Sequence, residues 1–298
     1  MPKIRLLNWS GHGNLGDDAM DMILREEFQD CQFVEEGEDW TILGGGTLLS
    51  PHGEFYEKIH NPQRTIGISL GVSFNWTGQG AEILRKMPLL FTRDYFSNQK
   101  LTQFEVPNRL SVDLWFRLFN PMSYGARQRV MVNLFLPLTR LFPHLTMMVD
   151  DCKLEYEQYH EAGFGGGRTS HFFAMSSNED LQFIPKAKLY TDPRELISEL
   201  SKCKRVVATR LHAIIAAYIA EVGQLYPVPY DPKIFHFYER VASTTRDKAR
   251  TMIDEHLQDI REIICGKEYR SLLLQSDRKA SQPLSELSKT KPLLTTNG

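Results

Sequence analysis

The stretch "KIRLLNWSGHGNLGDDAMDMILREEF", residues 3–28, passes from an apolar run through a glycine-rich turn into a helical pattern. The run "KIRLLNW" predicts a strand, and "DDAMDMILREEF" has the spacing of an amphipathic helix. Similar strand candidates recur along the chain, including "DWTILGG", "TIGISLGV", "LLFTRD", "RVVAT" and "QLYPVPY". Strands that alternate with helices predict parallel sheets covered by helices on both faces, so the fold class is α/β.

The length of 298 residues and the order of these patterns predict two domains. We expect a Rossmann-like domain over residues 1–119, a linker over 120–129, and a second Rossmann-like domain with terminal helices over 130–275. Residues 276–298 are polar and interrupted by proline, which is typical of a disordered tail. Doubly wound sheets bind ligands beyond the carboxyl ends of their strands, so the polar turns should meet in a cleft between the domains.

The formal net charge of -2 argues against a general nucleic-acid-binding protein. The four cysteines are far apart and lack metal or redox spacing, so we expect free thiols in a reducing compartment and no metal site. No stretch resembles a signal peptide or has the length of a membrane span. We therefore expect a cytoplasmic protein without a transmembrane segment, and leave open peripheral contact with the inner face of the cell membrane.

The turn "GHGNLGDDA", residues 11–19, combines backbone freedom with charge. Glycines such as Gly16 let backbone N–H groups approach a ligand closely, and Asn14 could hold a substrate hydroxyl. Asp18 is best interpreted as a capping residue of the next helix. The adjacent Asp17 would repel a phosphate, so we interpret it as a contact for a sugar hydroxyl or as a general base.

The stretch "LGGGTLLSP", residues 43–51, places three glycines directly after a strand. Three successive glycines cost much chain entropy, and a ligand that approaches Gly45, Gly46 and Thr47 would explain them. A tight crossover of the strand is the alternative.

Two arginines follow strands at positions where the cleft is expected. In "LLFTRDYFS", Arg93 ends a strand and suits a carboxylate or phosphate, although this stretch taken alone is better explained by a surface pair with Asp94. In "RVVATRLHAIIAAYIAEVG", Arg210 and His212 stand at the start of a helix, where an anion gains from both charge and dipole. Lys233 could contact a phosphate at the next helix, or lie on the surface.

Five stretches in order, "GNLGDDA", "LGGGTLL", "TRDYFS", "TRLHAIIAAYIAEVG" and "YDPKIFHFYE", resemble the polysaccharide pyruvyl transferase family. The resemblance covers the chain to about Val241. It implies two Rossmann-like halves facing a cleft in a GT-B-like architecture. It also implies an enzyme that moves the enolpyruvyl portion of phosphoenolpyruvate onto two sugar hydroxyls, which gives a cyclic pyruvate ketal in the biosynthesis of an exopolysaccharide or other cell-surface glycan.

The resemblance also implies roles for single residues. The arginine and histidine of the family's RLH motif correspond to Arg210 and His212, the arginine of its RD motif to Arg93, and the aspartate of its GD motif to Asp17. The family often has Asp-Pro-Ala where this chain has "DLW", residues 113–115, so this chain departs from the pattern after the aspartate.

The chemistry expected from the resemblance needs no metal or cofactor, since phosphoenolpyruvate is itself the donor. Arg93 and Arg210 would hold its carboxylate and phosphate. His212 would protonate the alkene methylene or the phosphate, and Asp17 would be the base for a hydroxyl of a sugar or lipid-linked glycan acceptor. A nucleotide-sugar glycosyltransferase of the same architecture is one alternative. A non-catalytic relative that binds a glycan precursor or a partner protein is another.

Overall fold

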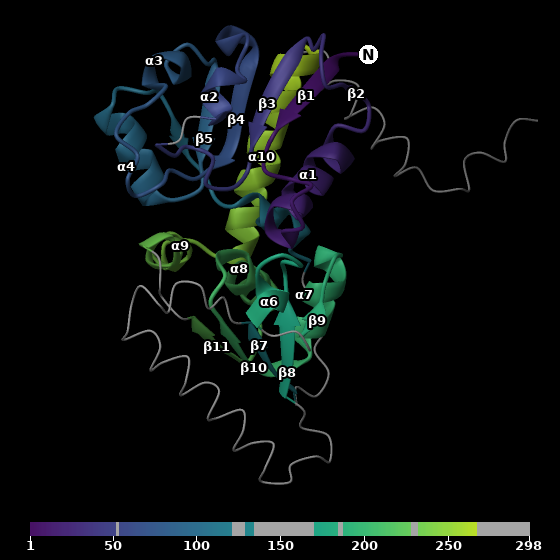
Figure 1. Cartoon of the computed structure of the whole chain (residues 1–298). Helices are drawn as coiled ribbons and strands as arrows, with labels where there is room; N and C mark the ends of the chain where they lie inside the picture. Colours follow the sequence, from purple (N-terminus) through teal and green to yellow (C-terminus); the bar gives the residue numbers. More distant parts are fainter. Residues whose placement is uncertain (52–53, 121–128, 134–169, 184–186, 228–231, 267–298) are drawn as a thin grey trace, which may run out of the picture.

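The computed structural model describes residues 1–51, 54–120, 129–133, 170–183, 187–227 and 232–266. It contains two parallel sheets, one in each of two lobes that lie one above the other (Figure 1). The first has the strand order β2-β1-β3-β4-β5-β6, and the second has the order β11-β10-β7-β8-β9.

The first lobe consists of the six-stranded sheet and the helices packed on it. Its strands are β1 (Lys3–Leu7), β2 (Gln32–Phe33), β3 (Trp40–Gly44), β4 (Thr65–Leu70), β5 (Leu89–Thr92) and β6 (Arg109–Leu110). Its helical elements are α1 (Leu15–Glu27), α2 (Glu54–Glu57), η1 (Pro62–Arg64), α3 (Ala81–Leu84), α4 (Tyr95–Gln103) and η2 (Leu114–Leu118). Every residue of β4 is buried, as expected for a central strand of a parallel sheet with both faces covered.

The second lobe consists of the five-stranded sheet and its helices. Its strands are β7 (Arg129–Asn133), β8 (Ser170–Ala174), β9 (Lys188–Leu189), β10 (Cys203–Ala208) and β11 (Gln224–Pro227). Its helices are α6 (Asp180–Phe183), α7 (Pro193–Ser201), α8 (Leu211–Ile219) and α9 (Pro232–Ala242). The apolar helix α8 is buried along nearly its whole length, because small residues such as Ala213 and Ala217 allow close packing.

Each sheet reverses the direction in which strands are added beside its first strand. In the first sheet β2 and β3 flank β1, and in the second sheet β8 and β10 flank β7. Open α/β sheets bind ligands at such reversals, where the loops after neighbouring strands diverge. The fold is thus α/β, with two Rossmann-like sheets that face a cleft. This is the GT-B-like arrangement that the sequence analysis expects.

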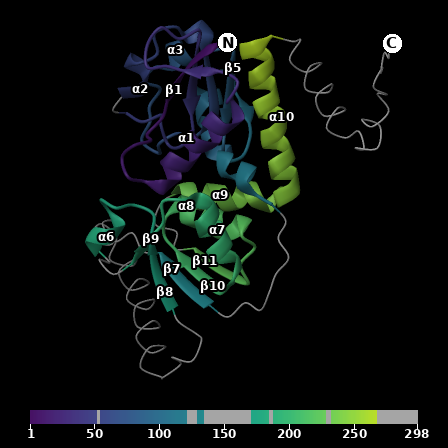
Figure 2. The same ribbon diagram turned by 90° about the vertical axis from the view of Figure 1, so that its right-hand side faces the viewer.

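The last described helix, α10 (Arg246–Cys265), leaves the second lobe and runs along the first (Figure 2). The ring of His256 stacks on Phe91 of β5 at 3.9 Å between centroids, and Arg261 Nε lies 3.3 Å from Glu27 Oε1 of α1. The sequence-based grouping of the terminal helices with the second domain therefore differs from the packing of α10. Helical spacing identifies the apolar stripe of α10 but not the surface that it covers.

Other predictions of chain organisation lie mainly outside the described residues. Residues 121–128 of the predicted linker and 276–298 of the predicted tail are not described, so the domain limits stay predictions. Among the described helices, none is long and apolar enough to cross a membrane.

The burial of α10 predicts a large stability effect for a single truncation. Leu257 is 1% exposed within the core, so Leu257→Ala should lower the free energy of unfolding by about 2–5 kcal/mol in urea denaturation. Glu255→Ala is the matched control, since Glu255 is exposed on the same helix and should change stability by less than about 0.5 kcal/mol. Equal stability of the two variants would contradict the packing of α10.

Candidate active site

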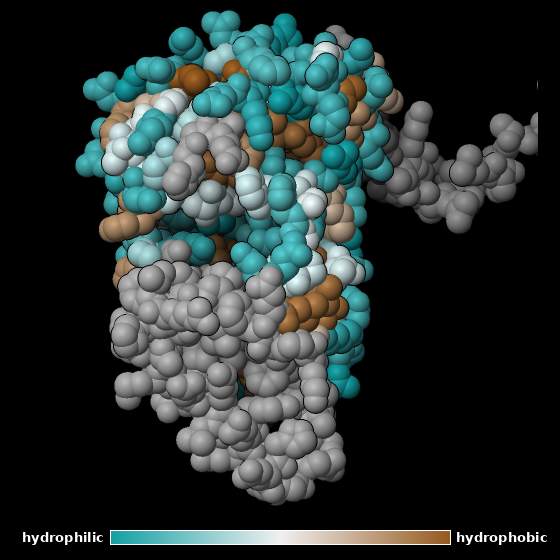
Figure 3. All heavy atoms as spheres, in the orientation of Figure 1, coloured by the Kyte–Doolittle hydropathy of each residue, from teal (hydrophilic) through white to brown (hydrophobic). Residues whose placement is uncertain are grey.

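A pocket of about 460 Å³ lies between the lobes, lined by loops that follow β1, β3, β5, β8 and β10. Figure 3 shows this face hollowed between the lobes, with hydrophilic side chains around much of the hollow. The predicted site residues that line the pocket are Asn14, Asp17, Gly46, Thr47, Arg93, Arg210, His212 and Lys233. Lining residues that sequence reasoning missed are Trp9, Leu48, Ser50, Phe55, Met175, Glu179 and Leu211.

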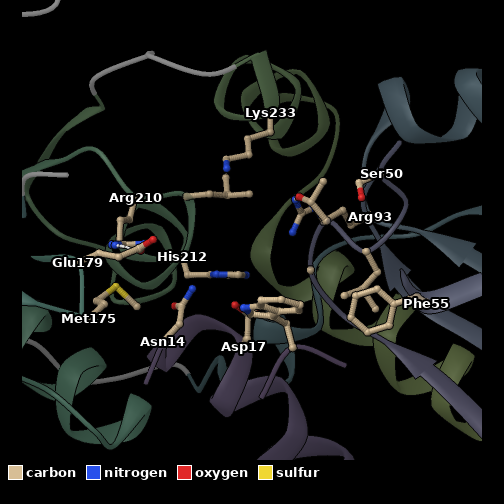
Figure 4. Close-up of a pocket in the computed structure, with 15 residues that line it drawn as sticks. Asn14, Asp17, Ser50, Phe55, Arg93, Met175, Glu179, Arg210, His212 and Lys233 are labelled. Atoms are coloured by element: carbon tan, nitrogen blue, oxygen red, sulfur yellow. Dashed lines mark hydrogen bonds and ion pairs between the residues drawn. The ribbon is translucent and has the colours of Figure 1, made fainter. Parts of the chain in front are cut away.

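The turn before α1 uses its polar groups mainly to build the helix start. Asn14 is the N-cap, and its Oδ1 accepts a hydrogen bond from the Gly16 backbone N–H at 3.0 Å. Asp18 Oδ1 accepts from the Gly11 backbone N–H at 2.7 Å and holds the turn closed. Figure 4 shows the amide nitrogen of Asn14 directed toward His212, and the contact of Asn14 with a substrate hydroxyl stays a prediction.

Gly16 makes room for the imidazole of the opposite lobe. A Cβ atom at Gly16 would lie only 2.0 Å from His212 Nδ1. Trp115 of η2 stacks on the same imidazole, with ring centroids 5.6 Å apart, and its Nε1 donates to the Gly16 carbonyl at 3.0 Å. Gly16 does not line the pocket, and its observed role is to let His212 approach α1.

Asp113 lies between two predicted site residues, one from each lobe. Its Oδ2 lies 3.4 Å from Arg93 Nη1 and 3.7 Å from His212 Nε2, and its Oδ1 accepts from the Trp115 backbone N–H at 3.1 Å. Burial alone would raise the pKa of this carboxyl group, but His212, Arg93 and the backbone N–H outweigh burial and lower the pKa below its usual value. Asp113 was recognised in the sequence only through the "DLW" comparison.

Arg93 is 5% exposed and is fixed on several sides. Its Nη2 donates to Thr47 Oγ1 at 2.8 Å, and its Nε lies 3.5 Å from Asp94 Oδ2. A Cβ atom at Gly71 would lie 2.8 Å from Nη2, so the guanidinium group packs against bare backbone. Thr47, predicted to bind substrate, lines the pocket but also positions Arg93.

The glycines after β3 divide between two roles. Gly45 has φ +70°, and a Cβ atom there would lie 2.3 Å from Met20 Sδ of α1. Gly45 is absent from the pocket lining, so the tight-crossover alternative describes it better than ligand contact. Gly46, with φ +76°, lines the pocket, and a Cβ atom there would lie 2.9 Å from Asp17 Oδ1.

Arg210 stands at the N-terminus of α8, the helix that follows β10. Its Nε lies 2.6 Å from Asp180 Oδ1, and its Nη2 lies 2.5 Å from Glu179 Oε2. Burial disfavours the guanidinium charge, but these two carboxylates outweigh burial and raise the pKa of Arg210. Asp180 is itself buried and also accepts from the Met175 backbone N–H at 2.8 Å.

The pocket therefore holds both cations and carboxylates. Figure 4 shows Arg93 and Arg210 on opposite sides of His212, with Lys233 directed into the cavity from α9. Burial raises the pKa of Asp17, although His212 and Arg93 oppose the rise. A carboxyl group of raised pKa beside an imidazole can exchange protons with a bound substrate. Among the described residues, no group of three or more His, Cys, Asp or Glu side chains could hold a metal ion.

The contact between Gly16 and His212 predicts coupling between the two positions. Gly16→Ala should destabilise the fold by about 1–3 kcal/mol, because the new methyl group overlaps the imidazole. In the double variant with His212→Ala, the overlap is removed and the loss should be largely recovered, as measured by a double-mutant cycle in urea. Additive effects of the two substitutions would contradict this packing.

The raised pKa of Asp17 predicts that replacing it with its neutral isostere, asparagine, increases the stability of the protein in a pH-dependent way. A carboxyl group whose pKa is raised on folding contributes most below its unfolded pKa, and that contribution is lost as the pH rises through the folded pKa. Asp17→Asn should therefore be more stable than the natural protein at pH 7, with a smaller difference at pH 4, in thermal melts. The exposed Glu35→Gln is the control. A destabilised Asp17→Asn at pH 7 would refute the prediction.

Comparisons with known structures give distant similarities. The protein KP1_0663 of Klebsiella pneumoniae subsp. pneumoniae NTUH-K2044, described as uncharacterized, is 15% identical over 81% of this chain and 88% of its own, with a TM-score of 0.49. TarM is 15% identical over 74% of this chain and 53% of its own (TM-score 0.36). Anabaena Alr3699/HepE, solved with UDP and glucose, is 9% identical over 92% and 99% (TM-score 0.35). No curated protein matches the chain.

The family comparison is more informative. The family model described as polysaccharide pyruvyl transferase matches residues 14–231. That range begins at the N-cap of α1 and includes the loops after β3, β5 and β10 that line the pocket. Because the match spans most of the chain, this protein belongs to the polysaccharide pyruvyl transferase family.

Proposed function

We propose that this protein transfers the pyruvyl group of phosphoenolpyruvate to two hydroxyls of a sugar in a polysaccharide or glycan precursor, which forms a cyclic ketal. The observation that carries the proposal is the placement of Arg93 and Arg210, from different lobes, in one pocket with His212 between them (Figure 4). Phosphoenolpyruvate presents a carboxylate and a phosphate, and guanidinium groups bind both.

The partners of the arginines indicate how a donor would be accommodated. Asp113 and Asp180, each nearly fully buried, anchor Arg93 and Arg210. Glu179, whose side chain is 49% exposed, binds the other end of Arg210 from the solvent side. A donor phosphate would replace Glu179 on Arg210 while Asp180 keeps the guanidinium group in place, and Lys233 would add a second cation.

In the proposed reaction, His212 and Asp17 supply and accept the protons that the bond changes require. His212 gives a proton to the methylene carbon of the donor, and the central carbon then accepts the oxygen of a first sugar hydroxyl, whose proton passes to Asp17. The bond between that carbon and the phosphate oxygen breaks, and a second hydroxyl of the same sugar attacks. Its proton leaves with the phosphate, and proton exchange between Asp17 and His212 restores the starting state. The products are a cyclic ketal and inorganic phosphate.

The proposal includes the setting expected from the family resemblance. The donor is a substrate, so no further cofactor enters the scheme. The acceptor is a sugar or a lipid-linked glycan intended for an exopolysaccharide or another cell-surface glycan. The reaction would take place in the cytoplasm, where phosphoenolpyruvate is available, or at the inner face of the cell membrane.

Two substitutions test the assignment. His212→Ala should lower phosphate release from phosphoenolpyruvate by about 10²–10⁴-fold, because proton transfer loses its donor. Arg210→Lys keeps the charge but loses the paired contacts of the guanidinium group, so the KM for phosphoenolpyruvate should rise. Activity is followed by phosphate release and by the product mass with a panel of glycan precursors. Arg205→Lys is the control, because Arg205 lies on β10, the strand that precedes Arg210, and is outside the pocket lining.

Full transfer activity in both His212→Ala and Arg210→Lys would refute these roles. A thermal shift with UDP, GDP or their sugars, and none with phosphoenolpyruvate, would instead support a glycosyltransferase. Sugar binding without phosphate release would support a non-catalytic relative.

A further inference from the structure

Trp9 contributes an exposed aromatic surface to the pocket that the proposed reaction does not use. It lies in the loop directly after β1 and retains 40% of its surface exposed, whereas Trp76 and Trp115 are fully buried. Trp9 lines the same pocket as Asp17, Ser50 and Phe55. A large aromatic side chain left in contact with water beside a reaction site indicates that a ligand covers it when bound.

Two aromatic side chains pack against the indole ring of Trp9, one on its face and one in an edge arrangement. The imidazole of His12 stacks on it at 4.3 Å between centroids, with an interplanar angle of 14°. Phe55 of α2 meets it at 6.0 Å in an edge arrangement of 62°. Because His12 covers one face of the indole, the opposite face is the one on which a flat ligand could stack.

The loop that carries Trp9 is held by both lobes. The His12 carbonyl accepts from Asn178 Nδ2 at 3.2 Å, and the Gly13 carbonyl accepts from the Ser177 backbone N–H at 3.2 Å. On the other side, Gly11 donates to Asp18 of α1 at 2.7 Å. A ring on a loop fixed in this way loses little conformational entropy when a ligand stacks on it.

We propose that Trp9 is the stacking platform for a neutral pyranose ring of the acceptor. This inference rests on the proposed function, because it takes the acceptor to be a sugar. The C–H face of a pyranose is apolar and flat enough to cover an indole, while its hydroxyls project from the rim. Asp17 and Ser50 line the same cavity and would receive those hydroxyls, with Asp17 placed to take the proton from the attacking one.

The charges of the pocket favour a neutral ring over a uronic acid. The carboxylates of Asp17 and Glu179 line the cavity, and Asp18 lies next to Asp17 in the chain. Under the proposed function the guanidinium groups are occupied by the anionic donor. Without the donor, Arg93 and Arg210 are already paired with carboxylates of the protein, so a sugar carboxylate on Trp9 would meet like charges in either state.

Binding measured without phosphoenolpyruvate tests this inference separately from the transfer reaction. The probes are the methyl glycosides of glucose, galactose, mannose and N-acetylglucosamine, with methyl glucuronide as the anionic counterpart. Isothermal titration calorimetry is applied to the natural protein, Trp9→Phe, Trp9→Ala and the control Phe74→Leu. Phe74 is 71% exposed and outside the pocket lining, so its substitution should leave sugar binding unchanged.

We expect at least one neutral glycoside to bind, to shift the emission of Trp9 to shorter wavelength, and to bind Trp9→Ala roughly tenfold more weakly or worse. Trp9→Phe keeps a flat ring and should be intermediate, and methyl glucuronide should bind more weakly than methyl glucoside. No binding of any neutral glycoside, equal binding by Trp9→Ala, or stronger binding of the glucuronide would overturn the proposal. Sugar binding that depends on Trp9, without ketal formation from phosphoenolpyruvate, would refute the proposed function and leave the platform standing.

Discussion

The site depends on the pairing of the buried Asp113 carboxylate with Arg93 and His212. It is 3% exposed, and it lies between Arg93 of the first lobe and His212 of the second. A buried charge is tolerated when it is paired, and removal of one partner from such a pair typically costs about 3–5 kcal/mol. The two lobes therefore meet in a way that keeps this carboxylate paired, which also sets where the guanidinium and imidazole groups stand in the pocket.

The residues that follow Asp113 help to orient the imidazole of His212. The aspartate caps η2, and η2 carries Trp115 against the imidazole while Gly16 leaves space on α1. The departure of "DLW" from the family's Asp-Pro-Ala pattern thus places a large ring next to the central histidine. In this chain the ring belongs to the core of the site and contacts both lobes.

The alternation of strands and helices was enough to predict the fold, and the site residues predicted from the polar turns include eight of the fifteen residues that line the pocket. The parallel strands of each sheet end at a common edge, and the two edges were expected to face one cleft, so Asp17, Arg93 and Arg210 could be expected to converge without knowledge of the strand order. The contacts that each of these side chains makes within the protein could not be predicted in this way. The roles of Asn14 and Gly16 depend on contacts across a turn or a lobe interface, and the packing of α10 depends on a surface that its own spacing does not encode.

The carboxylates around the arginines differ in what they can do. Asp113 and Asp180 are buried among backbone and side-chain partners, so they hold Arg93 and Arg210 in place whether or not an anion is bound. Glu179 reaches Arg210 from a half-exposed position, so its carboxylate would regain water if a bound anion displaced it. Under the proposed function, the arginines stay paired until the donor binds, and the donor would need to displace only the carboxylate whose release costs least.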